Sequence, residues 1–234
     1  MNKDLKKALS AAFEAPPPQK KRAFFRNVPL NYVNHFSFLL SQAGYIRKTT
    51  WALSVAVLAL AVAAGRYAPR DAMWVMAALM PFAALTAVSE SSRSSLHGME
   101  ELELAARFSL KSVIMARMGL IGLAHLVLFC LLAPLARSIS GVGLIRTAVY
   151  LITPYLLTTL LGLTVVRRVR GREGLYVCGG VSLLVGGLNA ALQSELYAPE
   201  RFPWWLAVLA LLAVFTGREY YNTIKKTEEL SWSL

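Results

Sequence analysis

The chain has few of the residues that build catalytic, metal or disulfide sites. Its 234 residues include only two cysteines and three histidines, and Cys130 and Cys178 form neither a CxxC pair nor a disulfide framework. It also lacks the GxxxxGK[ST] phosphate loop and the HExxH and GxSxG motifs. No Asp lies in any of its long apolar stretches, so the aspartate pair of an intramembrane protease is missing. We therefore predict that the chain is not an enzyme by itself and binds no cofactor or metal, and that both cysteines are small packing residues.

Acidic residues are scarce as well. The 13 Asp and Glu residues stand against 25 Lys and Arg residues, which gives a net charge of +12. A nucleic-acid-binding protein would need a soluble domain with a basic face, and no polar stretch of this chain is long enough to form one. Basic residues that flank membrane spans explain the same charge, so we expect no nucleic-acid partner.

Apolar residues are abundant and gathered in blocks. The AVILMFWYC set makes up 56% of the chain. A helix needs about 20 apolar residues to cross a hydrocarbon core of about 30 Å. The blocks that approach this length are 49–65, 72–89, 113–135, 147–166, 175–192 and 203–217. We therefore predict an all-α, polytopic membrane protein with about six transmembrane helices in residues 49–217.

The distribution of Lys and Arg predicts the orientation of these spans. Nineteen of the 25 basic residues fall in segments on one side of the predicted membrane, namely 1–48, 89–112, 167–174 and 218–234. Only five fall on the other side, in 66–71, 136–146 and 193–202. Basic loops face the cytoplasm. We expect a protein of the cell (cytoplasmic) membrane with both termini cytoplasmic and 218–234 as a cytoplasmic tail.

Two segments precede the first span. Residues 1–27 form a basic arm that is interrupted by three consecutive prolines at 16–18, which stop a helix and act as a stiff spacer. Residues 28–48 repeat apolar side chains every three or four positions, at Val33, Phe36, Leu40, Ala43 and Ile46. This spacing predicts an amphipathic helix at the bilayer surface, although a cytoplasmic helix packed on a partner would show the same pattern.

The polar loop 90–112 contains a second predicted helix. Gly98 is followed by Glu100, Glu101 and Glu103, and Arg107 lies four residues after Glu103. Acidic residues in the first turn and a basic residue later in the helix suit the helix dipole, and Glu103 and Arg107 can pair. This segment is either a solvated charged helix or a docking helix for a cytoplasmic partner.

Small and polar residues inside the predicted spans mark contacts between helices. One stripe of the fifth span carries small residues four apart, which lets another helix, of the same chain or of a second subunit, approach closely; these are Cys178, Ser182, Gly186 and Ala190. Three polar residues, Arg117, His125 and Asn189, are candidates for a polar cavity. For His125 and Asn189, hydrogen bonds between neighbouring helices are the other interpretation.

These features together resemble a permease of the type-2 family of ABC transporters. The resemblance consists of an amphipathic helix ending in GYIRKTTW before the first span, the segment MEELELAARFSLKSVIMAR after the second, and six spans in all. It implies that Glu100, Glu101, Glu103 and Arg107 couple this chain to a separate ABC ATPase subunit. ATP and Mg²⁺ would then be bound by that partner, and the permease would pair with itself or with a sister subunit. The sequence departs from the family pattern in that Gly98 precedes the acidic residues and the stub SELYAPERFP separates the last two spans.

A second hypothesis from another class stays open. The basic arm 1–27 has Leu5, Leu9 and Phe13 on one helical stripe, and this stripe could bind a cytoplasmic regulator. The chain would then be a membrane-anchored regulatory or scaffold protein, or an accessory subunit of a larger membrane complex. Neither the transport substrate nor its direction follows from the sequence.

Overall fold

The computed structural model describes residues 35–91, 110–169 and 172–232, and in these residues it confirms the all-α prediction. Apart from a single 3₁₀ turn, all regular structure in them is α-helical, with no strand. The helices are α3 (His35–Tyr45), α4 (Lys48–Tyr67), α5 (Ala72–Ser91), α8 (Leu110–Ser140), α9 (Leu144–Arg168), α10 (Arg172–Ala191), α11 (Gln193–Leu196) and α12 (Phe202–Trp232), with the 3₁₀ turn at Pro199–Arg201 before α12. All contacts described below lie within residues 36–234, which form one compact unit.

Six of the helices are long and apolar enough to cross a bilayer, as the apolar blocks predict. The membrane segments are Lys48–Tyr67, Ala72–Ser91, Met115–Ser140, Leu144–Arg168, Glu173–Ala191 and Pro199–Thr223. The chain is therefore a multi-pass membrane protein. The first and last blocks are short in the sequence, and each helix reaches full length by including flanking residues such as Arg66, Tyr67 and Tyr220, which can lie at the membrane surface.

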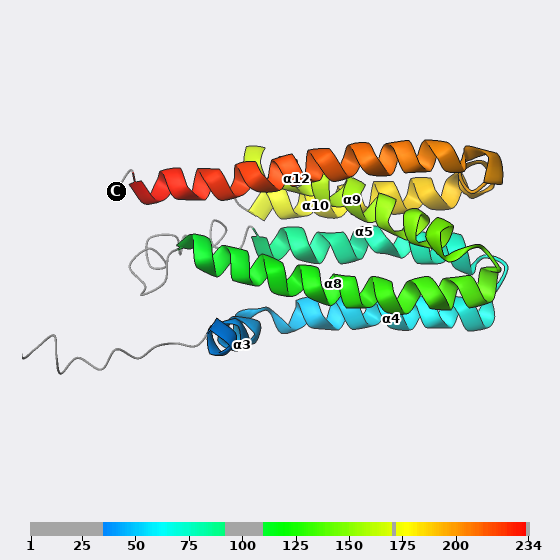
Figure 1. The fold of residues 1–234 in the computed structure, drawn as a ribbon, viewed down its shortest axis with the longest axis horizontal. Coiled ribbons are helices and arrows are strands. Elements are labelled where there is room, and N and C mark those ends of the chain that lie inside the picture. Colours follow the sequence, from blue (N-terminus) through cyan, green and yellow to red (C-terminus); the bar gives the residue numbers. More distant parts are fainter. Residues whose placement is uncertain (1–34, 92–109, 170–171, 233–234) are drawn as a thin grey trace, which may run out of the picture. The chain divides into compact units, whose positions relative to one another are not determined.

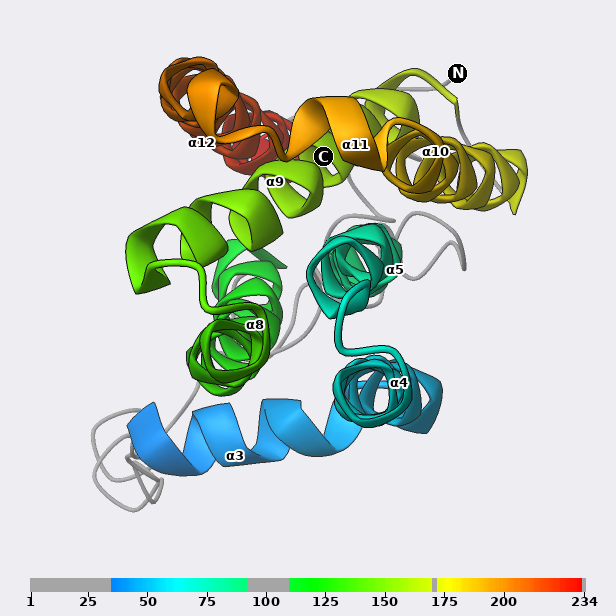
Figure 2. The same ribbon diagram turned by 90° about the vertical axis from the view of Figure 1, so that its right-hand side faces the viewer.

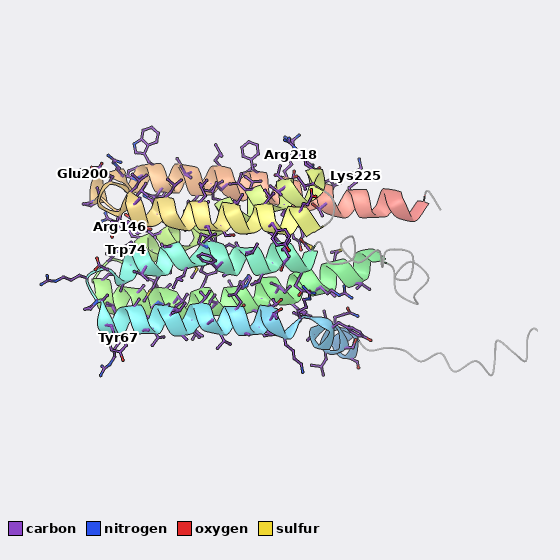
Figure 3. All side chains as sticks on the ribbon, turned by 180° about the vertical axis from the view of Figure 1, so that it is seen from behind. Tyr67, Trp74, Arg146, Glu200, Arg218 and Lys225 are labelled. Atoms are coloured by element: carbon purple, nitrogen blue, oxygen red, sulfur yellow. The ribbon has the colours of Figure 1, made fainter. Side chains whose placement is uncertain are left out.

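Successive spans run in opposite directions, so the bundle has two distinct ends (Figure 1). At one end α4, α8 and α10 begin and α5, α9 and α12 finish. We call it the basic end, because Arg47, Lys48, Arg167, Arg168 and Arg218 lie there. At the other, the hairpin end, short connections join α4 to α5 and α8 to α9. Figure 3 shows Arg218 and Lys225 near the basic end, and Tyr67, Trp74, Arg146 and Glu200 near the hairpin end.

α5 is the central helix of the bundle. It packs against α4, α8, α9 and α10 (Figure 2), and 50% of its membrane segment is buried, more than in any other described span. Its sequence explains this position, because closely spaced alanines let neighbouring helices approach and methionines fill the irregular gaps between them. Met76 and Met80 are fully buried, and so is Pro81, inside the helix.

α3 runs crosswise to α4 at the basic end (Figure 2). It lies within the predicted amphipathic helix 28–48, whose first seven residues are outside the described ranges. The helix ends at Tyr45 and not at residue 48, because Lys48 already begins α4. Gln42 and Ile46 are buried, whereas Leu40 and Tyr45 are 65% and 62% exposed. Exposed apolar side chains on a helix that crosses the span direction favour the interpretation as a surface helix.

α12 is the peripheral span, and it differs from the sequence prediction. It packs mainly on α9 and α8, and only 11% of its membrane segment is buried. The helix continues unbroken to Trp232, and its membrane segment reaches Thr223, so the last span extends past the apolar block. The predicted boundary at 217 follows the loss of hydropathy after Phe215, which ends an apolar run but does not end a helix.

Candidate functional site

A chain of buried polar groups connects three spans in the interior of the bundle. His125 of α8 is 2% exposed. Its Nε2 lies 3.2 Å from Thr86 Oγ1 of α5, and its Nδ1 lies 3.0 Å from the Tyr155 hydroxyl of α9. The Tyr155 ring stands edge-on to the imidazole, with 5.5 Å between ring centroids. The histidine thus holds α8 to both α5 and α9.

The direction of these hydrogen bonds follows from the single proton of Thr86. Its hydroxyl donates to the Ala83 carbonyl, one turn earlier in α5, at 2.8 Å. Toward His125 it can therefore only accept, so Nε2 carries the ring proton. In a neutral imidazole the other nitrogen is then an acceptor, and Nδ1 accepts a hydrogen bond from the Tyr155 hydroxyl. The series of hydrogen bonds runs from Tyr155 through His125 and Thr86 to the Ala83 carbonyl.

A second polar contact joins α5 to the start of α4 at the basic end. Glu90 lies in the last turn of α5 and is 4% exposed. Its Oε1 accepts a hydrogen bond from Thr50 Oγ1 at 2.9 Å and a longer one from the Arg47 backbone N–H at 3.4 Å. Arg47 is the N-cap residue of α4. The carboxylate thus accepts from the N-cap backbone N–H, as the Glu of a capping box does, at a helix end where the dipole favours negative charge.

An ion pair joins α9 to α12 at the same end. Arg167 Nη2 lies 3.0 Å from Glu219 Oε1, and the two side chains are 36% and 11% exposed. Arg167 lies in the last turn of α9, where a basic side chain also interacts favourably with the helix dipole. The pair ties the peripheral helix α12 to its main packing partner.

A cluster of polar and aromatic side chains lies at the hairpin end, where α10 is connected to α12. Tyr197, beyond α11, donates a hydrogen bond to Asn189 Oδ1 of α10, and Trp205 Nε1 donates to the Leu196 carbonyl at 2.8 Å. The Tyr197 ring stacks on Trp205 and stands edge-on to Tyr150 of α9. Burial raises the pKa of the Tyr197 hydroxyl, and the neighbouring Tyr150 raises it further. The cluster anchors the connection between the last two spans.

The small residues of α10 pack against α5 and α9. Gly186 lies so close to α5 that a Cβ built on it would be 2.9 Å from the Ala78 carbonyl oxygen. The Cys178 thiol donates to the Gly162 carbonyl of α9 at 3.6 Å. Ser182 is fully buried and bonds to the Cys178 carbonyl within α10, and Ala190 is half-buried. The predicted seam is thus found between helices of one chain.

The chain matches no protein-family model, no curated protein and no solved structure.

The residues predicted from the sequence have different environments in the structure. His125 and Asn189 are both buried and hydrogen-bonded to other segments, as interhelical contacts would be. Arg117 is half-buried on α8, two turns from His125. Cys130 is exposed on the outer surface of α8, so its prediction as a packing residue is wrong, since helical spacing turns it away from the core. The predicted coupling residues Glu100, Glu101, Glu103 and Arg107 lie outside the described residues.

The sequence analysis does not identify several of the interior polar residues. It places Glu90 in the loop after the second span and Glu219 in the C-terminal tail, because each apolar block ends at its first charged residue. Thr86 and Glu90 are four residues apart and therefore share a face of α5, which is a signal that α5 continues past the apolar block. Tyr155 had no such signal, because it is one of several hydroxyl residues in its span.

Proposed function

We propose that this chain is the membrane-spanning permease subunit of an ABC-type transporter. A separate ATPase subunit binds and hydrolyses ATP with Mg²⁺, and the permease works as a homodimer or with a sister subunit. The basic end faces the cytoplasm, where its cationic side chains meet the anionic surface of the cell membrane.

The observation that carries this proposal is the position of α5. This helix ends at Ser91, and Glu100, Glu101 and Glu103 follow it in the sequence after eight further residues. It also packs against four of the other five spans. The acidic segment lies between α5 and α8 in the sequence, so its movement would act on these two helices and, through the contacts of α5, on the centre of the bundle.

The described contacts show how α5 can pass such a force to its neighbours. Its end is bound to the start of α4 through Glu90 and Thr50 at 2.9 Å. One turn earlier, Thr86 binds His125 and so engages α8 and, through Tyr155, α9. When the ATPase pair closes on ATP, the acidic segment moves, and the spans shift between two packed arrangements, as in other rigid-body transitions.

The close approach of α10 to α5 suits a surface that slides. Gly186 allows helix backbones to meet without interlocking side chains. α10 can therefore shift along α5 at a smaller cost than a helix held by large interdigitating residues. This contact is the part of the bundle where we expect the packing to change during transport.

The test is recovery of the ATPase. The chain is purified in mild detergent from its own cells, and vanadate-sensitive ATP hydrolysis of the preparation is measured together with the identity of the co-purified chain. We expect an ATPase with Walker motifs. Reversing three charges with Glu100→Lys, Glu101→Lys and Glu103→Lys should lower its recovery at least about tenfold, because like charges across an interface cost several kcal/mol.

Two controls separate this outcome from others. Glu173→Lys changes an exposed acidic residue at the same end of the bundle, at the start of α10, and should leave the ATPase bound. Deletion of residues 1–27 should also leave it bound, whereas a membrane-anchored regulator would lose its partner with this arm. Absence of any such ATPase from the intact chain, or its full retention by the triple variant, contradicts the proposal.

A further inference from the structure

His125 is held between two other spans in one protonation state. The neutral ring with its proton on Nε2 satisfies both neighbours, because Nε2–H donates to Thr86 and Nδ1 accepts from Tyr155. Adding one proton at Nδ1 turns the ring into a donor at both nitrogens. The hydrogen bond from Tyr155 to Nδ1 must then break or reverse, whereas the bond to Thr86 can persist. Protonation therefore acts on the contact between α8 and α9 and spares the contact between α8 and α5.

Among the described residues, no carboxylate from the helices packed against α8 is bonded to the His125 ring. These elements are α4, α5, α9 and α12. On α5, Glu90 lies one turn beyond Thr86, and its Oε1 accepts from Thr50 and from the Arg47 backbone. α4 carries no ionisable side chain between Lys48 and its last two residues.

The remaining ionisable groups near the ring do not offset a positive charge. α9 contributes the phenol of Tyr155, which also has a side-chain hydrogen bond with Thr159 and an electrostatic interaction with Tyr220 of α12. Glu219, next to Tyr220, is paired with Arg167. Arg117 lies on the same helix as His125, about 12 Å along its axis, and is itself basic. An imidazolium at this position is therefore costly while the bundle is closed and dry.

We propose that His125 is a proton-binding site that controls the contact between α8 and α9: the neutral ring keeps the two spans together, and binding of one proton separates them. Water that enters between the separated helices solvates the imidazolium, so the open arrangement binds the proton more tightly than the closed one. By linkage, acidification favours the open arrangement. Each pH unit below the ordinary value for histidine, about 6.5, shifts the ratio of open to closed by up to about tenfold.

The proposal is tested on the purified chain in lipid nanodiscs and needs no ATPase, so its failure would leave the proposed function untouched. The variant His35→Gln/His97→Gln leaves His125 as the one histidine, and ¹⁵N NMR of labelled histidine reports its tautomer and charge. We expect the neutral Nε2–H form near pH 8 and the imidazolium on acidification toward about pH 4. An Nδ1–H form near pH 8, or a ring that stays neutral over the whole series, overturns the proposal.

The second measurement follows the helices themselves. Spin labels replace Leu123 of α8 and Leu161 of α9, which are 59% and 39% exposed, in a Cys130→Ser background, and the distance between them is measured over the same pH series. We expect a second, longer distance whose population grows together with the imidazolium signal. His125→Gln, which can keep a donor and an acceptor but does not titrate, should hold one distance throughout. If the ring is protonated without any change in distance, or if His125→Gln shows an equal change, protonation of His125 does not control the contact between α8 and α9.

Discussion

The Glu90 carboxylate of α5 accepts a hydrogen bond from the Thr50 hydroxyl of α4, with 2.9 Å between the two oxygens. This contact fixes the corner at which the surface helix α3 meets α4, because Arg47, the N-cap of α4, donates its backbone N–H to the same oxygen. It also fixes the end of α5, the helix that leads to the acidic segment. One buried side chain thus joins the end of α5 to the start of α4, just after α3 ends at Tyr45.

Removing this contact should weaken the bundle in a way that a double-mutant cycle can measure. We expect Glu90→Leu and Thr50→Val each to lower the free energy of unfolding. The two losses should not add, because both remove the same hydrogen bond. The coupling should be about 0.5–1.7 kcal/mol, the range for side-chain hydrogen bonds within membrane proteins. Unfolding by SDS in mixed micelles provides the measurement, and strict additivity would show that the bond contributes nothing.

The contact of α10 with α5 predicts opposite behaviour for two adjacent glycines. Gly186→Ala places a methyl group 2.9 Å from the Ala78 carbonyl oxygen, and we expect a loss of about 1–3 kcal/mol because backbone cannot yield as a side chain can. At Gly187 a Cβ would meet nothing within 4 Å. Gly187→Ala should be neutral or stabilising by up to about 1 kcal/mol through helix propensity. Thermal unfolding of the two variants in one detergent compares them, and an equal loss in both would argue against close packing at Gly186.

The ion pair between α9 and α12 predicts recovery by charge exchange. Arg167→Glu should destabilise the attachment of α12, because it leaves two carboxylates where Arg167 and Glu219 are 3.0 Å apart. Adding Glu219→Arg should restore most of the loss. We expect an effect of about 1 kcal/mol, since Arg167 is partly exposed and water screens the pair. Arg168→Glu changes the exposed neighbour and serves as the control. Limited proteolysis after Lys225 reports detachment of α12, and equal cleavage of the Arg167 and Arg168 variants would contradict the assignment.

The spans could be predicted from the sequence because one strong physical requirement determines them. A hydrocarbon core demands about 20 apolar residues in a row, and the six blocks between 49 and 217 meet or nearly meet it. The ends of the spans were less certain, because a helix continues past the apolar run wherever its polar side chains find partners. Glu90 binds Thr50 and Glu219 binds Arg167, so both charges belong to spans that hydropathy alone would have ended earlier.

The polar interior could be predicted only in part. His125 stood out because an imidazole in hydrocarbon is rare, but its partners Thr86 and Tyr155 come from helices that are 39 and 30 residues away. Which hydroxyl meets the ring depends on how α5, α8 and α9 pack, and periodicity within one helix carries no such information. Likewise, the stripe containing Gly186 indicated a close contact, but only the fold identifies α5 as the helix that makes it.

The hairpin end should be sensitive to alkali because of Tyr197. Burial raises the pKa of its hydroxyl, and Tyr150 raises it further, so the folded chain keeps this proton after an unfolded chain has lost it. The stabilisation is complete below the ordinary tyrosine pKa of about 10 and is lost as the pH rises from there toward the higher folded value. In that window the free energy of unfolding should fall by up to about 1.4 kcal/mol per pH unit.

Tyr197→Phe tests this expectation directly. The variant loses the hydrogen bond to Asn189 and should be less stable by about 0.5–1.5 kcal/mol at neutral pH, yet its stability should decline less steeply above about pH 10. Tyr67→Phe, at a position that is 86% exposed, should retain the full decline of the parent chain. Denaturant unfolding in detergent at a series of alkaline pH values gives the slopes. If Tyr197→Phe declines as steeply as the parent, other groups are responsible for the alkaline sensitivity and the buried phenol is not.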